Sequence, residues 1–230
     1  MAGRGPLRAD VEAGQAVYSP LVLAAYDAFV LGFSNRYVWR CRSATMLARY
    51  DELAGPRHLD AGVGTGWFLD HCHWRGQRPE ITLLDLNENS LRMAARRIKR
   101  FEPGVVHANV LEPVDLGEDE FDSIGLNYLL HCLPGALETK TAAVVRNLVG
   151  RLKPGGVLFG STILGRGVRH NTVGRLLMRV YNRKGIFANS DDDPDGLERG
   201  LVAQLGSVEL EIVGAVALFA ARASPAIIAA

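Results

Sequence analysis

Three glycines at alternate positions form the part of this sequence best suited to bind a ligand. Gly62, Gly64 and Gly66 directly follow a short apolar segment typical of a strand, and they open a segment typical of a helix. Glycine lets the backbone turn tightly and approach a ligand closely, and the first amides of a helix have no partner within it. A plain tight turn between strand and helix is the alternative interpretation. The loop predicts a site for a nucleotide-type ligand.

Two nucleotide-type ligands use a loop of this kind. A dinucleotide fingerprint, G-x-G-x-x-G, needs a third glycine where helix and strand pack closely, and counting from Gly62 that position is Trp67. An indole there would obstruct the close contact, although Asp85 lies at about the right distance for a ribose-binding acid. An NAD-dependent oxidoreductase therefore stays open as a rival interpretation.

The run from Asp60 to Gly66, Asp-Ala-Gly-Val-Gly-Thr-Gly, resembles the first motif of the class I S-adenosylmethionine-dependent methyltransferases. Asp85 matches that family's acidic residue after the second strand, where a carboxylate accepts both ribose hydroxyls. Asn109 stands where the family usually has an aspartate that accepts a hydrogen bond from adenine, and its amide oxygen can still accept. With a fourth strand at 121–127 and a Lys-Pro-Gly-Gly turn at 153–156, the resemblance covers roughly residues 55–165.

The resemblance implies S-adenosylmethionine as the cofactor and S-adenosylhomocysteine as its product. The cofactor-binding residues that it implies are Asp60, Gly62, Gly64, Gly66, Asp85, Leu86, Asn109, Val110 and Asn127. The fourth strand does not end in Asn-Pro-Pro-Tyr, so macromolecular nitrogen targets are less expected. The whole pattern resembles the small bacterial methyltransferases of secondary metabolism, which implies a small-molecule acceptor.

Methyl transfer from a sulfonium is an in-line displacement, so the protein has to align the acceptor and remove a proton when the acceptor is a hydroxyl. His131 follows the fourth strand, and histidine titrates near neutral pH, so we expect it to be the general base. Asn127 and Tyr128 are candidates for orienting the acceptor. His170, just past the fifth strand, is a candidate for reaching it from the opposite wall. Both histidines could instead be residues of a turn or loop without a site role.

The expected reaction is methylation of a hydroxyl oxygen without a metal ion. His71 and His73 flank Cys72, but positions i and i+2 do not share a helical face, so we expect no metal site. Nitrogen and carbon acceptors stay open. So does a protein of another class, which keeps the fold and binds the cofactor as a non-methylating or regulatory protein.

Size and composition are those of one globular domain. The chain has 230 residues, 48% of them hydrophobic, and its net charge of +1 gives no electrostatic footprint for a nucleic-acid backbone. Three scattered cysteines form no disulfide framework and fit a reducing, cytoplasmic setting. We expect no secretion signal and no membrane partner, and a monomer or homodimer.

Strand-like and helix-like segments alternate from residue 58, which predicts a doubly wound, mostly parallel, Rossmann-like α/β sheet with ligands at the carboxyl ends of its strands. The expected strands cover 58–60, 81–85, 105–108, 123–127, 157–163, 208–213 and 215–221, and the last two form an antiparallel hairpin that closes a seven-stranded sheet. The expected helices cover 66–73, 89–100, 138–152, 172–181 and 197–205.

A single domain over 1–230 is expected. Its parts are a flexible arm at 1–17, a helical lid at 18–54, a cofactor-binding core at 55–165, and C-terminal helices with the closing hairpin at 166–230. The lid is expected to hold two helices, one over 19–30 and one from residue 34 or 35 to 50. Their aromatic side chains either pack on the sheet or line the acceptor site, and they are Tyr26, Phe29, Tyr37 and Trp39. The family resemblance favours the lid and, with it, a flat, largely apolar acceptor.

Overall fold

The computed structural model describes residues 27–76 and 78–222, and the side chains of residue 31 onwards within those ranges. The helices, in chain order, are the π-helix η1 (Asp27–Val38), α3 (Ser43–Leu53), α4 (Trp67–His71), α5 (Glu88–Arg97), the 3-10 turns η2 (Lys99–Phe101) and η3 (Leu130–Cys132), α6 (Leu137–Val149), α7 (Thr172–Arg183) and α8 (Pro194–Leu205). The strands are β1 (Arg57–Ala61), β2 (Glu80–Asp85), β3 (Gly104–His107), β4 (Phe121–Asn127), β5 (Leu152–Ile163), β6 (Glu209–Val213) and β7 (Val216–Arg222).

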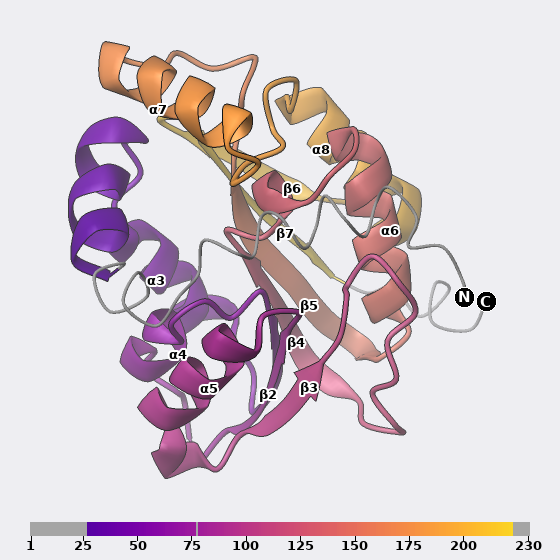
Figure 1. Ribbon diagram of the computed structural model, residues 1–230. Coiled ribbons are helices and arrows are strands. Elements are labelled where there is room, and N and C mark those ends of the chain that lie inside the picture. The colour runs from indigo at the N-terminus through magenta and orange to yellow at the C-terminus, as the bar shows by residue number, and fades with distance from the viewer. Residues whose placement is uncertain (1–26, 77, 223–230) are drawn as a thin grey trace, which may run out of the picture.

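One seven-stranded sheet forms the centre of the molecule, in the order β3-β2-β1-β4-β5-β7-β6 (Figure 1). The first five strands are parallel, and β7 pairs antiparallel with both β5 and β6. The predicted doubly wound, mostly parallel sheet with a closing antiparallel hairpin is therefore confirmed. From β1 the chain continues to β2 and β3 on one side of the sheet, and from β4 it continues to β5 on the other side. The direction of winding therefore reverses between β1 and β4. Ligands of such sheets bind outside the strand ends at this reversal.

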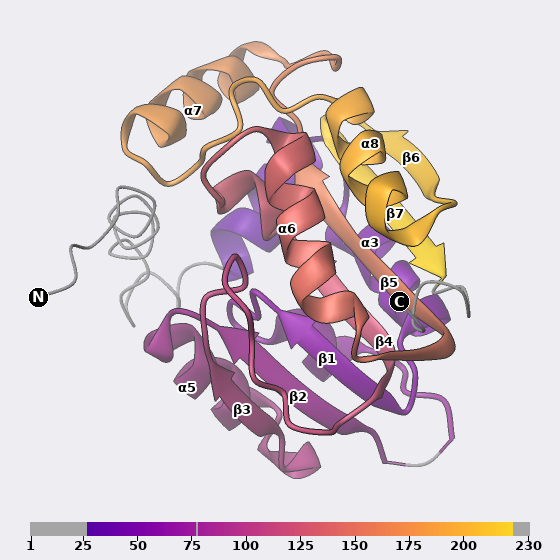
Figure 2. The same cartoon turned by 90° about the vertical axis from the view of Figure 1, so that its right-hand side faces the viewer.

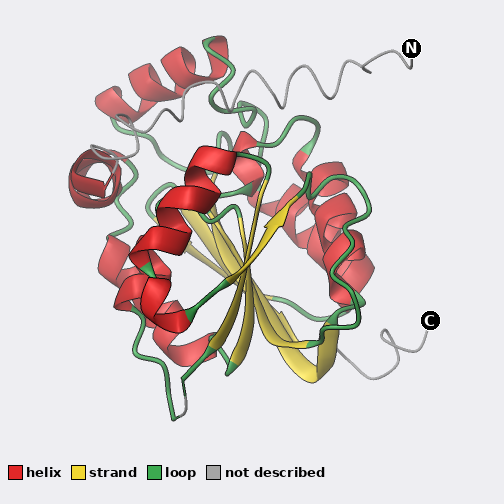
Figure 3. Ribbon diagram, turned by 60° about the horizontal axis from the view of Figure 1, so that its bottom comes forward, coloured by secondary structure: helices red, strands yellow, loops and turns green. Residues whose placement is uncertain are grey.

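Helices cover both faces of the sheet (Figures 2 and 3). One face packs against α6 and α8 through an apolar cluster that includes Ile124, Val144 and Leu201. The other face packs against α3, α4 and α5 through a cluster that includes Leu83 and Phe159. Because both faces are buried, β7 carries an unbroken apolar run from Val216 to Ala221, while β1 and β4 also bury polar side chains such as His58 and Ser123. Within the described part of the chain, no helix has both the length and the apolar character to cross a bilayer.

The helices ahead of β1 differ from the prediction. The single helix expected up to residue 50 is two elements, η1 and α3, with a break between them. At the break Arg40 takes a φ of 58°, and the Trp39 carbonyl accepts a 2.8 Å hydrogen bond from the Ala215 amide at the start of the last strand. This pairing with a distant segment replaces the next helical hydrogen bond, so the helix stops. Residues 1–26, with the expected arm and most of the first expected helix, lie outside the described residues.

Two boundaries in the C-terminal half also differ. β5 begins at Leu152, so the segment 153–156 expected as a turn belongs to the strand, where Gly155 accommodates a φ of 78°. α8 begins three residues earlier than expected because Asp193 caps it. The Asp193 side chain accepts a 2.7 Å hydrogen bond from the Gly196 amide, one of the donors left unpaired at a helix start.

Candidate active site

A cavity opens at the carboxyl edge of the sheet, at the ends of β1, β2 and β4. The fold brings onto its wall every residue expected to bind the cofactor, namely Asp60, Gly62, Gly64, Gly66, Asp85, Leu86, Asn109, Val110 and Asn127. These residues span 68 positions from Asp60 to Asn127 and meet because parallel strands end at one edge.

The glycine loop needs glycine for two different reasons. Gly62, Gly64 and Gly66 all have positive φ, at 76°, 52° and 71°. A Cβ on Gly62 would lie 2.8 Å from Leu129 Cδ1, and one on Gly66 would lie 3.0 Å from Ala94 on α5, so these two positions are packed closely. A Cβ on Gly64 would meet nothing within 4 Å. Gly64 therefore leaves an open cradle beside the cavity.

Asp85 ends β2 on the cavity wall. Burial raises the pKa of its carboxyl group to about 6, against the opposing effect of hydrogen bonds from the amides of Asn87, Gly64 and Leu86. The Asn87 amide donates to Oδ1 at 2.8 Å. These contacts fix an acceptor group between the glycine loop and the start of α5. A carboxylate held in this way can accept hydrogen bonds from a pair of hydroxyls.

Asp60 lies on the cavity wall and is only 4% exposed. Its Oδ2 accepts a hydrogen bond from the Tyr50 hydroxyl at 2.8 Å and faces His58 Nε2 at 3.3 Å. Burial, with the neighbouring Asp60 carboxylate, raises the pKa of Tyr50 well above its usual value. Tyr50 therefore keeps its proton and stays a hydrogen-bond donor to Asp60.

The end of the cavity beside β3 is formed by Leu86, Asn109 and Val110. Asn109 Oδ1 accepts a hydrogen bond from the Leu111 amide at 3.1 Å, and its Nδ2 donates to Glu112 Oε1 at 3.3 Å. These two bonds orient the side-chain amide. The oxygen keeps a second lone pair with which it can accept from a ligand.

β4 reaches the cavity with Asn127 and Tyr128. The side-chain oxygen of Asn127 accepts a hydrogen bond from the Ser161 hydroxyl on β5. Tyr128 takes a φ of 58°, which is uncommon for a residue with a side chain, and its hydroxyl donates to Asn35 Oδ1 at 2.9 Å. Asn35 is fully buried in η1. Tyr128 thus joins the end of β4 to the helix that precedes the sheet.

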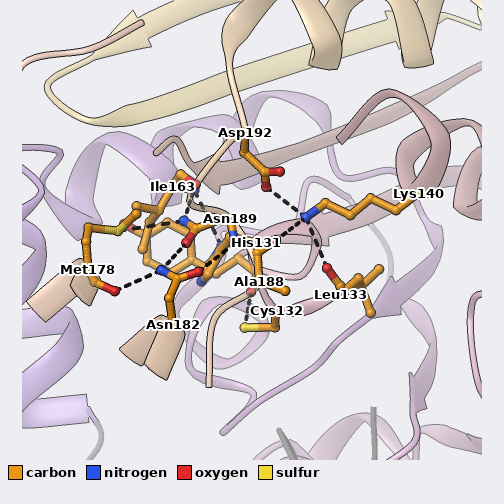
Figure 4. A network of polar contacts seen from close by, with 11 residues as sticks. His131, Cys132, Leu133, Lys140, Ile163, Met178, Asn182, Ala188, Asn189 and Asp192 are labelled. Carbon is orange, nitrogen blue, oxygen red and sulfur yellow. Dashed lines mark hydrogen bonds and ion pairs between the residues drawn. The ribbon is translucent and has the colours of Figure 1, made fainter. Parts of the chain in front are cut away.

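His131 is 2% exposed and is not among the described residues that line the cavity (Figure 4). Its ring packs edge-on against Phe187 with the centroids 4.5 Å apart. Nδ1 accepts a 3.4 Å hydrogen bond from the Ile163 amide, which places the proton of the neutral ring on Nε2. Burial and the charge of Lys140 lower its pKa to about 3. His131, the expected general base, is therefore shielded from the cavity and is a very weak base.

The chain around His131 is held by a buried polar network (Figure 4). Lys140 Nζ donates to the Leu133 carbonyl at 3.0 Å and to the Ala188 carbonyl at 2.9 Å. It also pairs with Asp192 Oδ2 at 2.8 Å. The Ala188 amide donates to the His131 carbonyl at 2.8 Å. These contacts give the surroundings of His131 a structural role.

His170 belongs to another depression, which it lines with Arg40, Ile212 and Gly214. Its ring lies edge-on to Trp39 with 6.2 Å between the centroids, and burial lowers its pKa. The structure does not bring His170 to the wall of the main cavity. Its placement therefore does not support the expected reach to the acceptor.

The four aromatic residues expected at the acceptor site lie in different surroundings. Tyr26 and the side chain of Phe29 lie outside the described part of the structure. Trp39 is 2% exposed and packs with Met178 in an apolar cluster beneath α7, while Tyr37 is 55% exposed. Neither is among the described residues of the cavity wall. Trp39 therefore packs in the protein interior, which is the alternative to lining the acceptor site.

Among the residues of the cavity wall that sequence reasoning missed, three come from segments that carry no cofactor motif. Leu31 comes from η1, Tyr50 from α3, and Cys132 from the turn after β4. None belongs to a motif, and each reaches the cavity through packing between segments that are distant in the chain. The only available signal was the proximity of Cys132 to the end of the predicted fourth strand.

Comparison with known proteins gives a consistent set of relatives. A family described as "Methyltransferase domain" matches residues 59–158. Demethylluteothin O-methyltransferase of Streptomyces thioluteus is 39% identical over 208 residues, which cover 90% of each chain. Methyltransferase ctvB of Aspergillus terreus is 42% identical over 93% of this chain and 95% of its own length. The Physcion biosynthesis cluster O-methyltransferase of Aspergillus chevalieri is 37% identical over 94% and 97%.

Solved structures share the fold at low identity. The CurJ carbon methyltransferase superposes with a TM-score of 0.64 at 15% identity, over 95% of this chain and 62% of that chain. The N-methyltransferase NodS of Bradyrhizobium japonicum, in complex with S-adenosylhomocysteine, gives 0.56 at 18% identity, over 79% and 85%. An O-methyltransferase family protein from Burkholderia thailandensis gives 0.61 at 20% identity, over 79% and 56%. This chain thus spans less than two thirds of the CurJ and Burkholderia chains.

Proposed function

Because the chain belongs to the class I S-adenosylmethionine-dependent methyltransferases, we propose that it methylates a hydroxyl oxygen of a small secondary metabolite. The oxygen is proposed because the relatives from Streptomyces thioluteus and Aspergillus chevalieri are both described as O-methyltransferases. The observation that carries the proposal is the row of side chains along the carboxyl edge of the sheet, since it fits the parts of the cofactor in order.

The strand order β3-β2-β1-β4 sets that row. Asn109 and Val110 after β3 would hold the adenine, and Asp85 at the end of β2 would accept both ribose hydroxyls. The glycine loop after β1, with its open cradle at Gly64, would hold the amino-acid portion beside Asp60. When bound, the cofactor supplies an electrophilic methyl group on a sulfonium. The sulfonium joins the ribose to the amino-acid portion, and the cavity-wall residues after β4 would line the space beside it.

Alignment of the acceptor falls to the residues that follow β4. Asn127 and Tyr128 lie on the cavity wall there, and both are fixed by hydrogen bonds to other segments. In-line displacement depends on such fixed geometry because a small misplacement of the acceptor raises the barrier. We assign no proton transfer to His131, since it is buried with a pKa of about 3.

The proposed reaction uses no metal ion. Among the described residues, no group of three histidine, cysteine, aspartate or glutamate side chains is arranged to hold one. The two carboxylates on the cavity wall, Asp60 and Asp85, already accept hydrogen bonds from the protein. The proposal gives both carboxylates another role, which is to bind the cofactor's polar groups.

Calorimetric titration with S-adenosylhomocysteine, S-adenosylmethionine and NAD tests the cofactor. Both adenosyl ligands should bind and NAD should not, because Trp67 heads α4 where a dinucleotide loop needs its third glycine. Phenolic and enolic acceptors are then incubated with S-adenosylmethionine, and products are identified by a mass gain of one methyl group and by NMR of the methylated atom. Binding of NAD alone would refute the proposal, and methylation only at nitrogen or carbon would refute the oxygen assignment.

A further inference from the structure

We propose that Tyr50 and His58 are positioning residues, which hold the Asp60 carboxylate so that one of its oxygens is free for the amino group of the cofactor's amino-acid portion. The inference rests on the proposed function, because it concerns the same cavity. It assigns a role to two buried side chains that no motif identified.

A directed chain of hydrogen bonds reaches Asp60 from the sheet. Nε2 of His58 faces the Asp60 carboxylate, with 3.3 Å to Oδ2, so the proton of the neutral ring lies on Nε2, where it can donate to that oxygen. Nδ1 then accepts from the Ser123 hydroxyl, 2.7 Å away, and the hydroxyl oxygen accepts from the Gly55 amide at 2.8 Å. Every group in the chain thus donates toward Asp60.

Tyr50 supplies a second donor from another element. Its hydroxyl, on α3, donates at 2.8 Å to the same Oδ2 atom that faces His58. A carboxylate has acceptor sites on both oxygens, and within the described part of the chain both donors reach Oδ2, so Oδ1 can accept from a ligand in the cavity. The Tyr50 ring stacks on Phe68, another residue of the cavity wall, with the centroids 5.3 Å apart. The donor is therefore fixed in place.

Burial makes these hydrogen bonds energetically important. His58 and Ser123 have no exposed surface, and Tyr50 is 2% exposed. A carboxylate in such surroundings is costly unless donors compensate it, so the orientation of Asp60 follows from these two donors. Because Gly125 on β4 has no side chain, it leaves space for the Asp60 carboxylate and the His58 ring. A Cβ there would lie 3.0 Å from Asp60 Oδ2 and 3.2 Å from two atoms of the His58 ring.

The ligand group that fits the free oxygen is a cation. Asp60 lies near the end of β1, between Asp85, assigned to the ribose, and Asn127, assigned to the acceptor side. The amino-acid portion is joined to the ribose through the sulfur and is the cofactor's only part that carries an ammonium group, which would pair with a buried carboxylate. The two positioning residues should therefore affect ligands that carry this amino group and spare those that lack it.

Two ligands, one with the amino-acid portion and one without it, test this expectation. S-adenosylhomocysteine carries the amino-acid portion, whereas 5′-methylthioadenosine has a methyl group on the sulfur in its place and keeps the adenine and the ribose. Calorimetry of Tyr50→Phe should show an affinity for S-adenosylhomocysteine that is at least about 10-fold weaker, as expected for one hydrogen bond to a charged group, and an unchanged affinity for 5′-methylthioadenosine. Ser123→Ala, which changes only the remote start of the chain, should give a smaller loss with the same selectivity.

Tyr181→Phe is the matched control, because Tyr181 is a half-buried tyrosine of α7 that is not among the described residues of the cavity wall. It should leave both affinities unchanged. Since each comparison uses two ligands on the same folded sample, a general loss of stability cannot imitate the selective effect. Equal weakening of both ligands, or no weakening by Tyr50→Phe, would overturn the positioning role. If the unmodified protein bound neither ligand, the proposed function itself would fail before any variant was made.

Discussion

Lys140 and Asp192 form an ion pair in the protein interior, with 2.8 Å between Nζ and Oδ2 and at most 3% of either side chain exposed. Lys140 lies on α6 and Asp192 just before α8. The same ammonium group donates to the carbonyls of Leu133, on the cavity wall, and Ala188. One buried cation therefore holds the wall after β4 against the segment that leads into α8.

Removing that cation should destabilise the protein strongly. In Lys140→Met, Asp192 becomes a buried carboxylate without its partner, and two carbonyls lose their donor, so the free energy of unfolding should fall by about 3–5 kcal/mol. Urea unfolding measures the change. Arg199→Met is the control, because the Arg199–Glu138 pair is exposed on both sides, and it should leave the unfolding midpoint unchanged. A Lys140→Met protein as stable as the unmodified one would show that the pair does not hold the wall.

Gly64→Ala should separate ligand binding from backbone strain. An alanine at a φ of 52° costs about 1–2 kcal/mol of stability, and its methyl group would project into the open cradle beside the cavity. Affinity for S-adenosylhomocysteine should fall roughly tenfold or more. Gly117→Ala carries a matched strain, with a φ of 63° and nothing within 4 Å, but Gly117 is not among the described residues of the cavity wall. It should lose similar stability and keep full affinity, and equal affinities in the two variants would contradict the cradle.

Asp85→Asn should stabilise the ligand-free protein while weakening cofactor binding. Burial raises the pKa of Asp85 from 3.8 to about 6, so the folded state holds the proton more tightly than the unfolded chain. The stabilising contribution of the protonated group is complete below pH 3.8 and is lost as the pH rises through about 6. At pH 7.5 the asparagine removes this cost, and the free energy of unfolding should rise by at most about 3 kcal/mol, at 1.36 kcal/mol per pKa unit.

The pH dependence gives this prediction its control. Thermal unfolding of both proteins from pH 4 to pH 8 should show the advantage of Asp85→Asn growing as the pH rises from about 4 to about 6 and staying constant above it, because only in that interval does the folded protein hold a proton that the unfolded chain has lost. Affinity for S-adenosylhomocysteine should be about tenfold lower in the variant at pH 7.5, because an amide oxygen accepts the ribose hydroxyls less strongly than a carboxylate. An advantage that did not change with pH would rule out titration of Asp85 as its cause.

The His131 ring should stay neutral throughout the physiological pH range. Its pKa is lowered to about 3 by burial and by the charge of Lys140, and its Nδ1 already accepts from the Ile163 amide. NMR of the ring carbon between the two nitrogens, followed from pH 5 to pH 8, should show no titration, with free imidazole in the same samples as the reference. A titration midpoint near 6.5 would restore His131 as a candidate general base.

The sequence determined the fold and the location of the cavity because both depend on local patterns. Alternating strand-like and helix-like segments imply a parallel sheet, and parallel strands end at one edge. Residues that follow consecutive strands must then meet, which is why Gly64, Asp85 and Asn109 could be assigned to one site from the sequence alone. The choice of glycine at position 64 could also be predicted locally, because glycine adopts a positive φ without strain whatever surrounds it.

Only the tertiary structure decided the roles of side chains whose surroundings come from distant segments. The pKa of His131 depends on burial against Phe187 and on the charge of Lys140, and neither contact is visible in the residues next to it. Tyr50 reaches Asp60 because α3 packs against β1, and Trp39 ends a helix because it pairs with Ala215. Burial and hydrogen bonding are set by what the folded chain places around a group, so residue type and spacing alone could not predict them.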